Sequence, residues 1–207
     1  MKTTNMVLAG AMALVLTGGA HAAGLSDGTF DEGAGAGSFA TYGTGSNIGA
    51  WSVDSGSVDL IGSYWVGPPT GGYSVDLDGY FAAGTISQSF SLAAGTYNLS
   101  FWLAGNTDGG STVKTVDVAV NGGAPAVFTF NTAGHDHNSM GWVQETVQFT
   151  TTGATTVSFA SGDDAQSAWG AAVGGVTVSA VPEPATTTLL VGGLALIGMA
   201  ARRRRQD

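Results

Sequence analysis

The sequence predicts an all-β fold, a β-sandwich or jelly roll, and three observations support this prediction. Segments between the glycines alternate apolar and polar residues, which is typical of strands with one buried face. Turn signals rich in Gly, Asp and Asn recur about every ten residues. No segment within residues 24–180 has the roughly 3.6-residue period of an amphipathic helix. Many short strands at this spacing favour a sandwich or jelly roll.

The alternation is clearest in residues 96–103, and it predicts strands at several other places. The apolar faces expected of these strands are Tyr97, Leu99, Phe101 and Leu103; Ile86, Phe90 and Leu92; Val116, Val118 and Val120; Phe128 and Phe130; Val143, Val147 and Phe149; Val157 and Phe159; and Val176 and Val178. Residues 33–45 are rich in Gly, Ala and Ser and are predicted to form a loop over the sandwich.

The N-terminal residues 1–23 have the order of a secretory signal peptide. Lys2 precedes an apolar run over residues 7–16, and Ala20-His21-Ala22 gives the small-x-small pattern that signal peptidase needs, so cleavage is expected after Ala22 or Ala23. A membrane anchor is the alternative, but the run is well short of the roughly 20 apolar residues that span a bilayer.

The C-terminal residues 181–207 have three parts. Val181-Pro182-Glu183-Pro184 interrupts regular structure, since proline cannot donate a backbone hydrogen bond. Residues 185–201 are uncharged and largely apolar, which predicts a short transmembrane helix. The cluster that ends the segment, Arg202, Arg203, Arg204 and Arg205, is expected to stay on the cytoplasmic side, so that residues 24–180 lie outside.

This order of Pro182-Glu183-Pro184, apolar helix and arginine cluster closely resembles the PEP-CTERM sorting signal. The resemblance implies recognition and removal of the tail by an exosortase, an integral membrane protease. It also implies a Gram-negative bacterium that makes exopolysaccharide, with the protein at the cell surface or in the extracellular matrix. A plain C-terminal anchor is the alternative.

Residues 24–180 form one predicted domain that is strongly acidic. Lys114 is its sole basic residue apart from histidine, and it contains all but two of the chain's 15 Asp and Glu residues. Nucleic acid is excluded as a partner, because phosphate binding needs Lys and Arg. Acidic polysaccharide would need a bridging divalent cation, whereas neutral glycans and cations remain open. Cysteine is absent, so no disulfide stabilises the domain.

The domain also resembles a known family in four segments. These segments are residues 56–65 (GSVDLIGSYW), 72–79 (GYSVDLDG), 101–106 (FWLAGN) and 140–142 (MGW). They are similar to the choice-of-anchor C family, which is related to a plant cell-wall group of galactose-binding-like jelly rolls. The resemblance implies a carbohydrate-binding type of β-sandwich without established catalytic activity. The chain departs from the family at Gly174 and Gly175, where an acidic and an amide side chain are usual.

Asp27-Gly28-Thr29-Phe30-Asp31-Glu32 resembles the opening of such modules, which often helps to hold a structural calcium ion. The resemblance therefore implies a calcium site at Asp27, Asp31 and Glu32, with oxygen ligands of the kind that calcium prefers. An acidic turn before the first strand is the alternative, and the loss of the family's acidic residue at Gly174 weakens the calcium interpretation.

Two further groups of polar residues have alternative interpretations. Asp76 and Asp78 share one strand face and could bind an ion or act as an acid–base pair, but a structural role before an Asp-Gly turn is favoured. His135 and His137 would converge on a metal only in a loop, and the favoured interpretation is a polar loop. No motif of a catalytic nucleophile, phosphate loop or zinc protease occurs, so no catalytic residue is predicted.

Trp102 and Trp142 lie out of phase with their apolar neighbours and are predicted on a solvent-facing strand surface. Trp102 shares that face with Asn98, and an aromatic ring beside an amide suits stacking on a sugar. Packing under loops is the alternative for both tryptophans. Trp51 is predicted in the core.

The sequence therefore predicts a non-enzymatic, exported carbohydrate-binding protein associated with exopolysaccharide or biofilm. A structural or adhesive matrix protein without saturable glycan binding is the second hypothesis, and a glycan hydrolase is the third.

Overall fold

The computed structural model describes residues 24–33, 35–80, 82–163, 167–182, 192–194 and 202. The predicted signal peptide with Ala22 and Ala23, the motif residues Glu183 and Pro184, and the arginines Arg203, Arg204 and Arg205 lie outside these residues. Within the described part, no helical segment has both the length and the apolar character needed to cross a bilayer. Most of the predicted apolar helix, residues 185–201, is outside that part.

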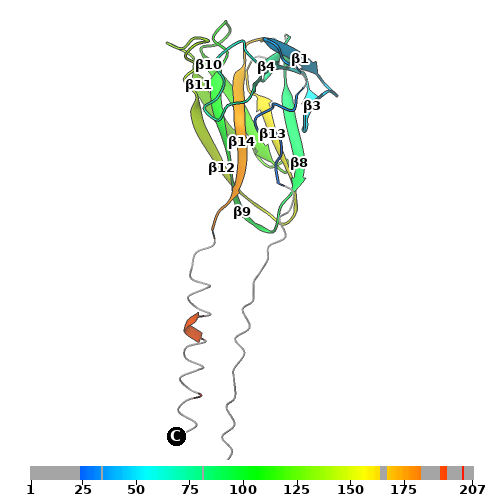
Figure 1. The fold of residues 1–207 in the computed structure, drawn as a ribbon, viewed down its shortest axis with the longest axis vertical. Helices are drawn as coiled ribbons and strands as arrows, with labels where there is room; N and C mark the ends of the chain where they lie inside the picture. The colour runs from blue at the N-terminus through cyan, green and yellow to red at the C-terminus, as the bar shows by residue number, and fades with distance from the viewer. Residues whose placement is uncertain are drawn as a thin grey trace, which may run out of the picture.

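Two antiparallel six-stranded sheets form a jelly-roll β-sandwich (Figure 1), which confirms the predicted fold class. The front sheet contains, in spatial order, β1 (Phe39–Gly43), β4 (Ser57–Ile61), β5 (Ser74–Asp76), β14 (Ala171–Ala180), β9 (Gly95–Gly105) and β12 (Val143–Thr151). The back sheet contains β11 (Ala126–Asn131), β10 (Val113–Val120), β13 (Ala154–Ser161), β8 (Thr85–Ser91), β3 (Trp51–Ser55) and β2 (Asn47–Ile48). A small third sheet pairs β6 (Asp78–Gly79) with β7 (Ala82–Ala83).

Aromatic side chains fill the space between the sheets. Phe101 of the front sheet lies 5.1 Å from Phe159 and 5.3 Å from Phe128 of the back sheet, measured between ring centroids, with both pairs edge-to-face. Trp51 is fully buried, as predicted, and packs on Phe159 and Phe30. Edge-to-face pairs each add about 0.5–1.5 kcal/mol beyond the area that they bury. Many of the predicted apolar residues, such as Leu99 and Val157, are in the core, whereas the prediction was wrong for Val143, which is exposed near the end of an edge strand.

The prediction of a loop over residues 33–45 was wrong for residues 39–43. These residues form β1, which pairs with β4 in the register Phe39 to Ile61 and Thr41 to Asp59. The strand is short and lies at the sheet edge, so its pattern contains few apolar residues and is hidden by the glycines on either side.

The edge of the front sheet presents polar residues on its outer face. In β4, Val58 and Leu60 are fully buried in the core, so that Asp59 and Ile61 lie on the opposite face, where Asp59 is partly exposed and Ile61 is buried. Asp59 is directly opposite Thr41 of β1 on one side and Asp76 of β5 on the other. This register places a carboxyl-rich row on the outer surface of the sandwich.

Candidate functional site

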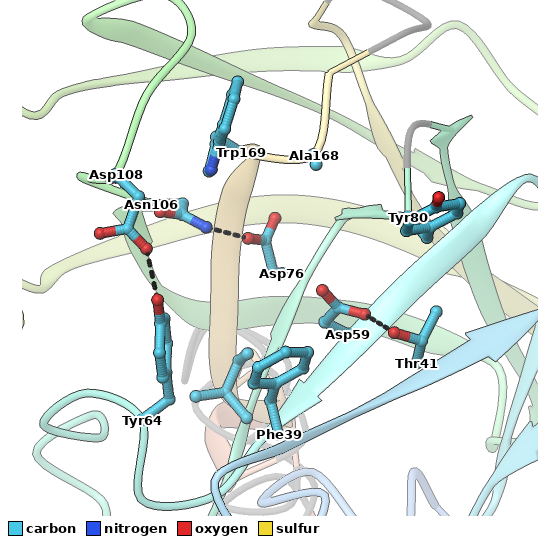
Figure 2. A pocket seen from close by; sticks show the side chains of 11 residues that line it. Phe39, Thr41, Asp59, Tyr64, Asp76, Tyr80, Asn106, Asp108, Ala168 and Trp169 are labelled. Atoms are coloured by element: carbon cyan, nitrogen blue, oxygen red, sulfur yellow. Dashed lines mark hydrogen bonds between the residues drawn. The ribbon is translucent and has the colours of Figure 1, made fainter.

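A pocket of about 210 Å³ opens over this outer row. Five of its residues come from β1, β4 and β5, and the others come from loops around these strands. Its lining consists of Phe39, Thr41, Asp59, Ile61, Tyr64, Asp76, Tyr80, Asn106, Asp108, Ala168 and Trp169. In Figure 2 the carboxyl groups of Asp59 and Asp76 lie between the rings of Trp169 and Phe39.

Asp76 forms the buried floor of the pocket, with 1% of its surface exposed. Its Oδ1 atom accepts hydrogen bonds from the backbone N–H groups of Asp78 (3.0 Å) and Gly170 (2.9 Å), and its Oδ2 atom accepts one from Asn106 Nδ2 (2.8 Å). Burial raises the pKa of Asp76 to about 8, although these hydrogen bonds favour the ionised form. The carboxyl group is therefore fixed in position, while its negative charge is poorly compensated.

Aromatic rings form the walls of the pocket. Trp169 is 37% exposed and Tyr80 is 76% exposed, which leaves much of both rings accessible. The Tyr64 ring packs edge-on against Phe39, with 5.4 Å between the centroids. The Tyr64 hydroxyl donates to Asp108 Oδ2 at 2.8 Å, and this hydrogen bond is the main cause that raises the pKa of Tyr64.

The loop that contains His137 supports this wall. His137 Nε2 is 2.7 Å from Asp108 Oδ1, and its ring is 4.6 Å from that of Tyr64. The Val66 N–H group donates to the His137 carbonyl at 2.8 Å, which joins the two loops through their backbones. His137 therefore holds Asp108 and Tyr64 in place, and its neighbour His135 bonds through Nδ1 to the Ser139 carbonyl.

Lys114 lies behind the pocket and is almost fully buried. Its Nζ atom donates to the backbone carbonyls of Gly109 (2.7 Å) and Trp169 (2.5 Å), which belong to two different pocket loops. Burial lowers the pKa of Lys114, and the charges of Asp163, Asp76 and Asp78 oppose this shift. Through these hydrogen bonds Lys114 holds the Trp169 loop against the sandwich.

Asp78 and Asp163 complete a buried acidic group around Lys114. Burial, followed by the nearby charge of Asp78, raises the pKa of Asp163 to about 6. Asp163 Oδ1 accepts a hydrogen bond from the Thr115 N–H group at 2.9 Å, while its buried Oδ2 has no hydrogen-bond partner among the described residues. Gly170 is required here, because a Cβ atom at this position would lie 2.7 Å from Asp78 Cγ.

Trp102 and Asn98 lie elsewhere on the front sheet, in β9, whereas Trp142 lies in the loop just before β12 and not on a strand as predicted. Trp102 is partly buried and sits opposite Gln144 of β12, in phase with Asn98. Trp142 is also partly buried, and its indole Nε1 donates to the Val66 carbonyl at 2.9 Å. The Val66 carbonyl thus lies beside Trp142, and no observation tests the predicted glycan binding by Trp102 and Trp142.

The predicted calcium residues surround a tight turn at the start of the domain. The Glu32 N–H group donates to Asp27 Oδ1 at 3.2 Å, and the Asp31 carboxylate accepts a hydrogen bond from Thr29 Oγ1 at 2.8 Å. Asp27 Oδ2 is buried without a hydrogen-bond partner among the described residues, so this one oxygen would suit a cation. Calcium takes about 6–8 oxygen ligands. Within the described part of the chain, no group of three His, Cys, Asp or Glu residues gathers to hold a metal, and calcium stays a prediction.

Most of the pocket was not identified from the sequence. Asp76 and Asn106 belong to segments that carry the family resemblance, but nothing in either segment indicates that they meet. Trp169 lies in a loop without strand periodicity. The sequence did single out Asp76 together with Asp78, but the structure places them in two different strands, β5 and β6, and Asp76 alone lines the pocket.

Comparisons with solved structures find partial likenesses. The exo-β-1,3-galactanase of Phanerochaete chrysosporium is 22% identical over 59% of this chain, with a TM-score of 0.40, and this chain spans 26% of it. CBM35 from Paenibacillus barcinonensis is 19% identical, with a TM-score of 0.42, and 69% of this chain matches 99% of that module. TmCBM61 in complex with β-1,4-galactotriose is 17% identical, with a TM-score of 0.43, over 76% of this chain and 97% of that one.

Comparisons of sequence identify the family. No curated protein matches the chain. A family model described as a protein of unknown function, DUF642, matches residues 10–179, and a PEP-CTERM protein-sorting motif matches residues 180–205. The second match confirms the predicted sorting tail, which indicates an exported protein that is anchored in a membrane by its C-terminal end before processing. The chain thus belongs to the DUF642 family, as an exported member with a PEP-CTERM sorting motif.

Proposed function

We propose that this exported protein binds carbohydrate, without cleaving it, through the pocket between Trp169 and Asp76. The observation that carries the proposal is the position of exposed aromatic rings beside carboxyl and amide groups in one small cavity. A sugar needs both kinds of surface, since its C–H groups pack on an aromatic face while its hydroxyl groups form hydrogen bonds. Asn106 and Asp76 are held rigidly by their hydrogen bonds, so little ordering is needed on binding.

A non-catalytic role fits the arrangement of the carboxyl groups. Glycosidases use two carboxyl groups that reach the scissile bond from either side. Asp76 is 1% exposed and accepts three hydrogen bonds, so it does not reach a scissile bond in the pocket beside Asp59. We expect no release of reducing ends from a panel of polysaccharides. Release that disappears in Asp59→Asn would instead make the protein a hydrolase.

The proposal is tested on a glycan array with the exported protein and three single variants, with and without added calcium. We expect Trp169→Ala to weaken binding at least tenfold, equivalent to about 1.4 kcal/mol. Trp102→Ala and Trp142→Ala serve as matched controls and should change affinity less than twofold.

Two outcomes would contradict this assignment. Loss of binding in Trp102→Ala or Trp142→Ala, with Trp169→Ala unchanged, would place the site on the surface that the sequence indicated. A protein that binds no glycan would favour the structural or adhesive matrix role.

The proposed processing and cellular location of the protein follow from the sorting motif. Signal peptidase and an exosortase would process the two ends, and the mature protein would remain at the surface or in the exopolysaccharide matrix of a Gram-negative cell. Calcium, if it binds at Asp27, is proposed to stabilise the N-terminal turn, because Asp27 is not among the residues that line the pocket.

A further inference from the structure

The pocket offers acceptors to a ligand, because several of its donors are used internally. Thr41 Oγ1 donates to Asp59 Oδ1 at 2.5 Å, Asn106 Nδ2 donates to Asp76 Oδ2 at 2.8 Å, and the Tyr64 hydroxyl donates to Asp108 Oδ2 at 2.8 Å. Each of these donors already forms a hydrogen bond with a carboxyl group of the same pocket. A carboxylate is an acceptor with about four lone-pair sites, so the partly exposed Asp59 retains capacity for a donor on the ligand.

The electrostatic environment also favours a positively charged ligand. Asp59, Asp76 and Asp108 line the pocket, and no lysine or arginine is among the lining residues. Asp78 and Asp163 lie behind the floor, where Lys114 is the nearby cation and its Nζ atom is bonded to backbone carbonyls. Burial raises the pKa of Asp59, and a cation bound beside this side chain would favour its ionised form.

The aromatic walls and the size of the pocket suit a sugar rather than a bare ion. Trp169 and Tyr64 present rings on which a C–H face can stack, and an ammonium group close to such rings gains a further cation–π attraction. The volume of about 210 Å³ is below the roughly 300–1,000 Å³ of pockets for drug-sized ligands, so one sugar ring is the appropriate size.

Building on the proposed carbohydrate binding, we propose that the pocket recognises an amino sugar with a free ammonium group, such as a deacetylated hexosamine unit of a polysaccharide. The ammonium group would lie against the partly exposed carboxylate of Asp59, and the ring would stack on Trp169. An N-acetylated sugar lacks this charge, and a uronic acid would be repelled.

The test compares two probes of equal length, an oligomer of glucosamine and an oligomer of N-acetylglucosamine. Isothermal titration calorimetry of the exported protein, at a pH where the free amine is charged, is expected to give at least tenfold tighter binding of the glucosamine oligomer. Asp59→Asn, which removes one charge and preserves the side-chain shape, should lower that preference at least fivefold.

Asp54→Asn is the matched control. Asp54 is exposed on β3 of the back sheet, so this variant changes the net charge equally without touching the pocket. If Asp54→Asn and Asp59→Asn lower the preference for the glucosamine oligomer equally, the cationic oligomer is attracted by the net charge of −9 and not by the pocket. This result would overturn the proposal.

The remaining outcomes separate this proposal from the carbohydrate-binding function on which it rests. If neutral or N-acetylated oligomers bind as tightly as the glucosamine oligomer and depend on Trp169, the amino-sugar proposal fails and carbohydrate binding stands. If no oligomer or glycan on the array binds, both fail. A circular dichroism melting curve for each variant verifies that it is folded before the affinities are compared.

Discussion

Replacement of Lys114 by methionine is expected to lower the free energy of unfolding by about 3–5 kcal/mol, the range for removal of one partner from a buried charge group. Methionine keeps most of the side-chain volume but cannot donate to the Gly109 and Trp169 carbonyls. It also leaves Asp76, Asp78 and Asp163 without their nearby cation. Urea unfolding followed by circular dichroism measures the change.

A double variant separates the charge effect from the loss of hydrogen bonds. Asp163→Asn removes one of the carboxyl groups that Lys114 compensates, so the Lys114→Met/Asp163→Asn protein should be less destabilised than the sum of the single changes. If Lys114→Met lowers the free energy of unfolding by less than about 1 kcal/mol, which is the contribution of an exposed ion pair, then the hydrogen bonds of Lys114 do not hold the two loops together.

The protein is also expected to lose stability as the pH rises from about 4 to about 8. The pKa values of Asp76 and Asp163 are raised from 3.8 to about 8 and about 6 on folding, so the folded state binds more protons than the unfolded state between these values. Stability then falls with increasing pH, by a total on the order of several kcal/mol. Asp27 and Asp59, whose pKa values are also raised, act in the same direction.

Burial lowers the pKa of Lys114 from 10.5, so Lys114 has the opposite effect on the pH profile: its contribution makes stability rise with increasing pH. Thermal unfolding at a series of pH values provides the measurement, with Asp76→Asn expected to flatten the profile. The exposed Asp54→Asn variant should leave the slope unchanged. A melting temperature that stays constant or rises between pH 4 and pH 8 would show that the buried carboxyl groups do not titrate as described.

The sequence identified the strands whose residues alternate over a long stretch. Leu99, Phe101 and Leu103 are all fully buried, and Trp102 between them is not, as the period of two requires. The pairing order of the strands could not be read in the same way. β14, the last strand in the described part, lies between β5 and β9 in the centre of the front sheet (Figure 1), and no local pattern specifies that position.

The pocket was difficult to predict for the same reason. Phe39, Tyr64, Asn106 and Trp169 are far apart in the chain and meet because β1, β4, β5 and β14 are neighbours in one sheet. Strand periodicity indicates the direction of an aromatic side chain only within its own strand, which favoured Trp102. A tryptophan in a loop, such as Trp169, has no periodicity that would indicate its direction.

Nuclear magnetic resonance of the tryptophan side chains tests the central claim most directly. The chain has 5 tryptophans, and each gives a separate indole N–H signal. During titration of the ¹⁵N-labelled protein with the glycan selected on the array, the Trp169 signal should shift until it saturates, while the signals of Trp102 and Trp142 stay in place. A Trp169 signal that does not move at saturating glycan, or a shift confined to Trp102 and Trp142, would contradict carbohydrate binding in this pocket.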